Sequence, residues 1–472
     1  MKTKKEATLV HAFIPIIVLV ASLFIAITKF EADPHIPIIV AIVVAAGIAI
    51  FSLGYKWNEI EKGSIETIQM AMQAILILMI IGTVIGVWIL SGTVPTMIYY
   101  GLKILSPGIF LVATAIICAI VSLATGSSWT TAGTVGIALM GVGQGLGIPM
   151  EIVAGAIVSG AYFGDKMSPL SDTTNLAPAM AGATLFEHIQ HMLYTTLPSF
   201  IIALILYGII GIKYAGQVLD TANIDIILNG ISSNFNISPL LLLPPVIVII
   251  LVVLKIPALP GLIAGTTIGG IFAAIFQGSN IGDIINAAHY GFEIESGVEM
   301  VDELLNRGGL DSMMWTVSLI LLAMTFGGIM EKTGMLQAIG NTILKFANNT
   351  GSLITATILT SIAVNFLAAD QYLSIVIPGR MYKDVYDERG IHPKVLSRTL
   401  EDAGTLTSAL IPWNTCGAFM HSALLVSPFA FAPFAFLNII NPIIAIIYGY
   451  TGFSITKIDN NKKNGSKQIK PI

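Results

Sequence analysis

The sequence predicts an all-α polytopic membrane protein with 12–14 transmembrane helices, built as an inverted-topology repeat whose broken helices lie at the membrane midplane. Three observations predict this fold class. Of the 472 residues, 55% are hydrophobic and only 11% are charged, whereas soluble domains carry about 25% charged residues. Apolar runs of ~20 residues, the length that crosses a bilayer, recur along the chain. The two halves of the sequence also resemble each other.

Ten apolar runs are continuous enough to predict transmembrane helices. They lie at residues 10–28, 36–54, 68–90, 107–124, 192–212, 238–254, 257–277, 312–330, 352–369 and 428–450. Three further runs, at residues 127–148, 152–175 and 371–419, are apolar but interrupted by polar residues. Counting these interrupted runs gives the predicted range of 12–14 crossings.

Positive charge predicts the orientation, because cytoplasmic loops carry an excess of lysine and arginine. Lysines lie at the N-terminus, in the loop at residues 380–398 and in the tail at residues 457–472. We therefore expect both termini in the cytoplasm and the acidic segment at residues 293–303 outside. The chain divides into a first half at residues 1–236, a second half at residues 237–456 and the basic cytoplasmic tail.

The repeat places residues of the first half about 240 positions before their counterparts in the second. The matched segments are 86–92 with 328–334, 127–136 with 370–379, and 164–175 with 404–415, within repeat cores at about 68–212 and 312–450. Chance similarity between two glycine-rich stretches is the alternative. The basic loop at 380–398 corresponds to residues 142–158, which hold no lysine or arginine. The two copies are therefore predicted to face opposite ways, as in many secondary transporters.

Polar residues within the apolar runs are the candidate site. Gly164 and Pro169 break one run among oxygen-bearing side chains, and the same break recurs at residues 404–415. Such oxygens suit a hard cation such as Na⁺, and a carboxylate can hold a proton instead. The Na⁺ site is predicted around Asp165 and Asp172. The predicted binding residues are Asp165, Asp172, Thr173, Thr174, Asn175, Ser127, Ser128, Asp370, Asn414 and Thr415.

Each of these predictions has a structural alternative. The serine, threonine and aspartate residues could cap helices in a loop, and Ser127 and Ser128 could serve close helix packing. Lys166, Glu401 and Asp402 are predicted charge partners, with Lys166 pairing Asp165 or a neighbouring acid. For the two acids, which follow the basic loop, a cytoplasmic salt-bridge role is the alternative to proton handling.

Several function classes find no support in the sequence. It contains no GxxxxGK[ST], HExxH or nucleotide-binding motif. His188 and His191 form too small a set to predict a metal site, so a polar cytoplasmic turn is expected there. We expect no enzymatic activity, no cofactor and no nucleic-acid partner. An ion channel or an intramembrane enzyme is a less favoured alternative.

The segments at residues 126–130, 164–175, 401–404 and 412–415 resemble the NhaC family of bacterial Na⁺/H⁺ antiporters over nearly the whole chain. The resemblance implies exchange of Na⁺ for H⁺ across the plasma membrane. The family also contains antiporters that exchange malate with two protons for Na⁺ and lactate, and this alternative stays open. A homodimer also stays open.

Overall fold

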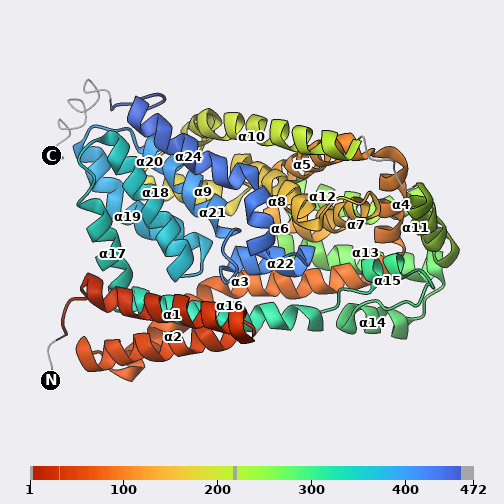
Figure 1. Ribbon diagram of the computed structural model, residues 1–472, viewed down its shortest axis with the longest axis horizontal. Helices are drawn as coiled ribbons and strands as arrows, with labels where there is room; N and C mark the ends of the chain where they lie inside the picture. The colour runs from red at the N-terminus through yellow and green to blue at the C-terminus, as the bar shows by residue number, and fades with distance from the viewer. Residues whose placement is uncertain (1–3, 31, 216–220, 459–472) are drawn as a thin grey trace, which may run out of the picture.

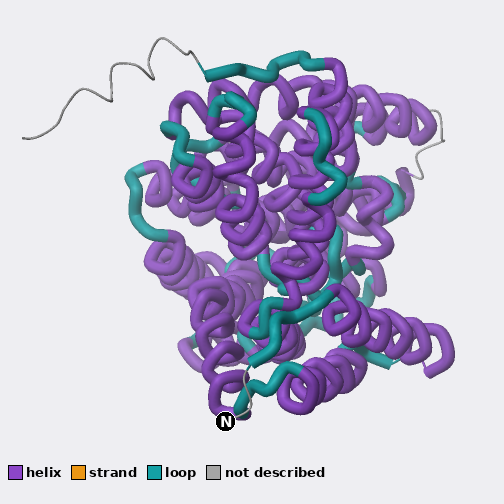
Figure 2. Tube along the Cα trace, turned by 90° about the vertical axis from the view of Figure 1, so that its left-hand side faces the viewer, coloured by secondary structure: helices purple, strands orange, loops and turns teal. Residues whose placement is uncertain are grey.

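The computed structural model describes residues 4–30, 32–215 and 221–458, and the chain is built of helices joined by short loops (Figure 1, Figure 2). Over these residues no β-strand forms, and only two isolated bridges pair Phe292 with Arg307 and Ile391 with Lys457. The all-α prediction is confirmed.

The first half contributes eleven α-helices and two π-helices. They are α1 (Leu9–Phe30), α2 (His35–Gly47), η1 (Ile48–Ser52), α3 (Trp57–Leu90), α4 (Thr93–Ile104), α5 (Pro107–Thr125), α6 (Ser128–Thr131), η2 (Ala132–Gly136), α7 (Ile137–Gly145), α8 (Met150–Met167), α9 (Asp172–Ala181), α10 (Leu185–Ala215) and α11 (Thr221–Asn234).

The second half follows. Its elements are η3 (Pro239–Leu242), α12 (Leu243–Val253), α13 (Ala258–Gln277), α14 (Ile281–Tyr290), α15 (Glu299–Leu305), η4 (Asp311–Met313), α16 (Met314–Lys332), α17 (Met335–Leu344), α18 (Thr350–Leu367), α19 (Gln371–Glu388), α20 (Pro393–Leu400), η5 (Glu401–Thr405), α21 (Leu406–Ser408), α22 (Thr415–Leu424), α23 (Pro428–Phe431), η6 (Ala432–Phe434) and α24 (Phe436–Thr451).

Within the described residues, eight helices are long and apolar enough to cross a membrane, and ten spans result if each of two sharply bent helix pairs is counted as one. The bent pairs turn by 98° between α11 and α12 and by 90° between α22 and α23. The number is below the expected 12–14 because the three interrupted runs fold into shorter or more polar helices. The chain is nonetheless a polytopic membrane protein, as predicted.

The long helices α3, α10 and α16 run along the long axis of the molecule (Figure 1). Helices α17, α19 and α20 gather at one end of this axis, and α4, α11 and α15 gather at the other (Figure 1). Helices α3 and α16 pack antiparallel. A Cβ atom at Gly63 would lie 2.7 Å from the Cβ of Lys332, and one at Gly82 would lie 2.7 Å from the Cγ of Met313.

Two helical hairpins reach toward each other from these opposite ends. In the first, α5 turns at Gly126 (φ 69°) into α6, and in the second, α18 turns at Ala369 (φ 58°) into α19. Each turn is followed by a side-chain cap. Ser127 Oγ accepts a hydrogen bond from the amide of Thr130 at 3.1 Å, and Asp370 Oδ1 accepts one from the amide of Leu373 at 2.9 Å. These caps satisfy amides that the helix itself leaves free.

Small residues let α5 and α8 approach closely, and this contact fixes the break that follows α8. A Cβ atom at Gly160 would lie 2.8 Å from the Cβ of Cys118, and one at Gly164 would lie 2.6 Å from the Cβ of Ser122. Such glycine spacing is typical of close helix pairs in membranes. It holds Asp165, the next residue along the chain, against the tip of the first hairpin.

Candidate functional site

A cavity of about 450 Å³ lies where the two hairpin tips meet the two helix breaks. The first tip contributes Ser127 and the second contributes Gln371 and Tyr372. The break between α8 and α9 contributes Asp165 and Asp172, and the break before α22 contributes Thr415. Polar groups from both halves of the chain therefore surround one space, which we name the central cavity.

Asp165 joins the first hairpin tip to the first helix break. Its Oδ2 accepts hydrogen bonds from the amide and the hydroxyl of Ser128, at 3.2 and 2.6 Å, and its Oδ1 accepts one from the hydroxyl of Ser171 at 2.6 Å. The side chain is buried, with 6% of its residue surface exposed. Three donors to one buried carboxylate stabilise its charged form, and a bound cation would have the same effect.

Asp172 joins the two halves of the chain. Its Oδ1 accepts the amide of Thr173 at 2.8 Å, and its Oδ2 accepts a hydrogen bond from the hydroxyl of Tyr372 on α19. In the second half, the thiol of Cys416 donates to Gln371 Oε1 at 2.8 Å, while Gln371 Nε2 is buried without a partner. A buried polar atom without a partner is rare in folded proteins and is suited to bind a ligand.

The other predicted binding residues support the backbone around the cavity. Thr174 donates to the carbonyls of Asp165 and Lys166, at 3.2 and 2.9 Å. Asn175 donates to the carbonyl of Ser171 at 2.6 Å, and Asn414 caps α22 by accepting the amide of Cys416 at 3.0 Å. These bonds match the capping alternative. Of the ten predicted binding residues, the cavity wall contains Ser127, Asp165, Asp172 and Thr415.

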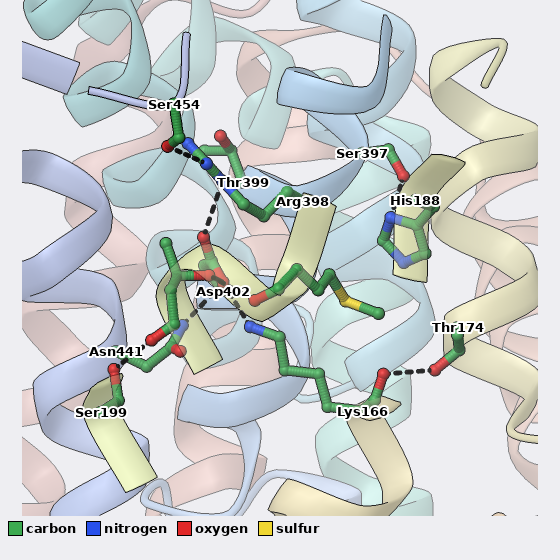
Figure 3. Close-up of polar contacts among 12 residues, drawn as sticks. Lys166, Thr174, His188, Ser199, Ser397, Arg398, Thr399, Asp402, Asn441 and Ser454 are labelled. Atoms are coloured by element: carbon green, nitrogen blue, oxygen red, sulfur yellow. Dashed lines mark hydrogen bonds and ion pairs between the residues drawn. The ribbon is translucent and has the colours of Figure 1, made fainter. Parts of the chain in front are cut away.

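Two of the predicted charge partners, Lys166 and Asp402, belong to a separate buried cluster (Figure 3). Lys166 Nζ pairs with Asp402 Oδ1, so its partner is an acid of the second half rather than Asp165. Arg398 Nε lies 3.5 Å from Asp402 Oδ2. Thr195 and Asn441 also donate to Asp402 Oδ1, at 2.8 and 2.7 Å. All three charged side chains are fully buried, so Asp402 forms its ion pairs, one of them with an arginine of the basic loop, inside the protein.

Glu401, one residue before Asp402 on the π-helix η5, is also fully buried. Neither of its carboxyl oxygens has a hydrogen-bond partner among the described residues. A π-helix turns side chains away from their regular helical positions and is frequent at functional sites. Glu401 is therefore a candidate to hold a proton inside the protein.

The two histidines lie in the first turns of α10 and are buried, not in an exposed polar turn. His188 Nδ1 shares a hydrogen bond with the hydroxyl of Ser397 (Figure 3). His191 Nε2 lies 2.9 Å from the carbonyl oxygen of Ser454. The described residues contain no group of three or more metal-binding side chains.

Sequence reasoning did not single out Tyr372 and Lys255, which also line the central cavity. Tyr372 lies two positions after the predicted Asp370, and this position was the available clue. Lys255 lies in the loop between α12 and α13 in a left-handed backbone conformation (φ 65°), which is uncommon for a residue other than glycine. It brings a cation to a wall that otherwise holds two aspartates.

Two hairpins that meet from opposite ends of an all-helical membrane protein, around a cavity with buried carboxylates, define a secondary transporter. A sequence model of the Na⁺/H⁺ antiporter family matches residues 160–453. The chain belongs to this family, as its resemblance to NhaC antiporters implies.

Relatives align over almost the whole chain. The Na⁺/H⁺ antiporter NhaC of Alkalihalophilus pseudofirmus is 43% identical, with 96% of this chain and 98% of that protein covered. The malate-2H⁺/Na⁺-lactate antiporter of Bacillus subtilis is 39% identical, and the alignment covers 96% of this chain and 97% of that protein. The solved structure of MtrF from Neisseria gonorrhoeae, an antimetabolite efflux pump, aligns with a TM-score of 0.42 and 15% identity over 92% of this chain and 97% of that chain.

Proposed function

We propose that this protein exchanges Na⁺ for H⁺ across the plasma membrane, with Asp165 and Asp172 as the residues that bind one ion or the other. The observation that carries the proposal is the placement of both carboxylates in the wall of the central cavity. Family membership supports Na⁺ and H⁺ as the transported ions.

Competition for the same carboxylates couples the two ions. A Na⁺ ion at Asp165 needs the carboxylate in its charged form, and a proton there removes that charge. Ser128 and Ser171 hold the carboxylate in place through its three hydrogen bonds. Only one of the two ions is then carried at a time, which is the requirement for exchange.

Alternating access follows from the inverted repeat, which we include in the proposal. Three pairs of positions 242 or 243 residues apart share a left-handed backbone: Gly92 (φ 80°) with Gly334 (φ 76°), Gly126 (φ 69°) with Ala369 (φ 58°), and Gly182 (φ 86°) with Leu425 (φ 57°). Helices α4 and α17, which follow the first of these pairs, lie at opposite ends of the molecule (Figure 1). Both findings support two copies that face opposite ways.

Under this proposal the domain halves meet at residue 236, and both termini and the tail at residues 457–472 face the cytoplasm. The basic loop at 380–398 lies on the same side, and α14 and α15 lie outside. Transport needs no cofactor and no enzymatic step in this scheme. We also propose that the protein forms a homodimer.

Exchange of malate for Na⁺ and lactate is the second candidate, and one observation favours it. The central cavity of about 450 Å³ lies within the range of roughly 300–1,000 Å³ that is usual for small-molecule sites, and it is far larger than a bare ion. Lys255 supplies a cation that could pair with a substrate carboxylate. The B. subtilis relative is named for that activity.

Proteoliposomes with a trapped pH dye test the proposal. Added Na⁺ should drive H⁺ movement without any organic acid in the wild type. In Asp165→Asn and Asp172→Asn the rate should fall by at least about tenfold, because one charged ligand is worth roughly 1.5–3 kcal/mol. Asp384→Asn, at an exposed position on α19, is the matched control. Movement only when malate and lactate are present would favour the second candidate, and full activity in both variants would remove these carboxylates from the mechanism.

A further inference from the structure

A second cavity, of about 430 Å³, lies at the opposite end of α22 from the central cavity. Thr415 and Cys416, at the N-terminus of α22, line the central cavity. His421, Ser422 and Leu425, at its C-terminus, line the second. We name this second space the α22 vestibule. Its remaining wall comes from α3, the end of α14, η4, the start of α16 and the loops on either side of α15.

Arg307 lies in this wall on a firmly held backbone. Its carbonyl accepts the amide of Phe292 at 3.1 Å, and the two residues after it are Gly308 (φ 89°) and Gly309 (φ 84°). A Cβ atom at Gly308 would lie 2.9 Å from the Cα of Gly86 on α3. Because only glycine fits so close to α3, the arginine is held at a defined position.

Among the described residues, no hydrogen bond or ion pair involves the guanidinium of Arg307. Its Nε is buried without a hydrogen bond, and no carboxylate of the described residues forms an ion pair with it. Glu293 also lines the vestibule, but it is exposed and beyond ion-pair distance. Burial lowers the pKa of Arg307 to about 10, so the side chain is charged at neutral pH.

Arg307 is half-buried, and it differs from the two fully buried cations, Lys166 and Arg398. Lys166 and Arg398 both pair with Asp402, as expected for charges removed from water. Arg307 lacks such an acid and faces a cavity in which His421 Nδ1 is a second buried atom without a partner. A charged group and a polar atom that both lack partners in one cavity indicate a ligand that carries the complementary charge.

We propose that the α22 vestibule binds a small organic carboxylate, with Arg307 as the residue that binds the carboxylate group. Arginine binds carboxylates through two parallel hydrogen bonds. The vestibule volume is in the usual range for small-molecule ligands, roughly 300–1,000 Å³, and it exceeds what a halide ion fills. The proposed transport function enters this proposal at one point only: it places the α22 vestibule on the external side of the membrane.

Fluorescence of Trp315, which lines the vestibule, gives a direct test on the purified full chain. Titration with L-malate and L-lactate should produce a saturable change that is lost in Trp315→Phe. Arg307→Gln should raise the Kd by about 10- to 100-fold, which corresponds to the loss of hydrogen bonds to a charged group. Arg307→Lys keeps the charge but not the paired geometry, so its Kd should lie between the two.

Lys103→Gln is the matched control, since it removes an exposed cation of α4, at the same end of the molecule, without touching the vestibule (Figure 1). Its Kd should equal that of the wild type. Equal Kd values for wild type, Arg307→Gln and Arg307→Lys would overturn the assignment, as would an absence of saturable binding or an identical response to NaCl. Na⁺-driven H⁺ movement without organic acid, measured on the same variants, reports separately on the proposed function.

Discussion

Asp402 is expected to be the acid whose loss destabilises the protein most, because two buried cations share it. Its Oδ1 accepts Lys166, Thr195 and Asn441, and its Oδ2 faces Arg398. Asp402→Asn keeps the shape but leaves both cations without a carboxylate partner. Breaking a buried ion pair costs about 3–5 kcal/mol. Lys166→Met leaves Asp402 paired with Arg398, so we expect the smaller loss of about 1–3 kcal/mol.

The double variant Asp402→Asn/Lys166→Met tests whether the ion pair between Lys166 and Asp402 causes the loss of stability. Its loss should be smaller than the sum of the two single losses by roughly 1–3 kcal/mol, because contacting residues are coupled. The measurement is unfolding in mixtures of a mild and a denaturing detergent, followed by circular dichroism. Glu401→Gln is the matched control. Its carboxyl oxygens accept no hydrogen bond from any residue that the structure describes, so the change should cost under about 1 kcal/mol. Strict additivity of the two single losses would refute the reasoning.

Two further substitutions test the cavity. Gly126→Ala should lower the stability by about 1–3 kcal/mol and slow Na⁺-driven H⁺ movement, because φ is 69° and the new Cβ would lie 2.8 Å from Leu170. Gly147→Ala is the control: φ is 68° but no atom lies within 4 Å of the new Cβ, so this variant has the backbone strain alone and should leave transport intact. Equal effects of the two variants on transport would contradict the packing argument. Tyr372→Phe removes the hydrogen bond to Asp172 between the two halves and should change the KM for Na⁺ in the liposome assay by about 10- to 100-fold, whereas an unchanged KM would show that this contact does not affect ion binding.

The sequence predicted those helices and helix breaks that are determined by residues close together in the chain. Apolar runs of sufficient length became helices, and the glycine–proline break at residues 164–169 became the end of α8. Asp165 and Asp172 were found because carboxylates are conspicuous in an apolar run. The helix count was less predictable, since a run such as 371–419 is divided by tertiary contacts that its own residues do not encode.

Pairings across the repeat could not be predicted either. Lys166 and Asp402 are 236 positions apart, and only the meeting of the two halves brings them together. Arg307 was a single basic residue in an acidic loop, and its lack of a partner depends on how α3 and α16 pack around it. Thr174 and Asn175 donate to backbone carbonyls, and polarity alone cannot separate such a supporting residue from one that binds an ion.

The position of α22 has a consequence for how the membrane voltage acts on this protein. Its ten residues, about 15 Å of helix, are all that separates the central cavity from the vestibule along the chain. If water fills both cavities, each cavity is at the electrical potential of the solution on its own side. Most of the membrane voltage then falls across the length of α22 rather than across the ~30 Å hydrocarbon core. Trp129 and Phe419 stack here with ring centroids 4.2 Å apart and fill the space between. An ion that moves past one helix would then experience nearly the whole field, about 2.3 kcal/mol per charge at 100 mV, through a displacement that a small rocking of the repeats can supply.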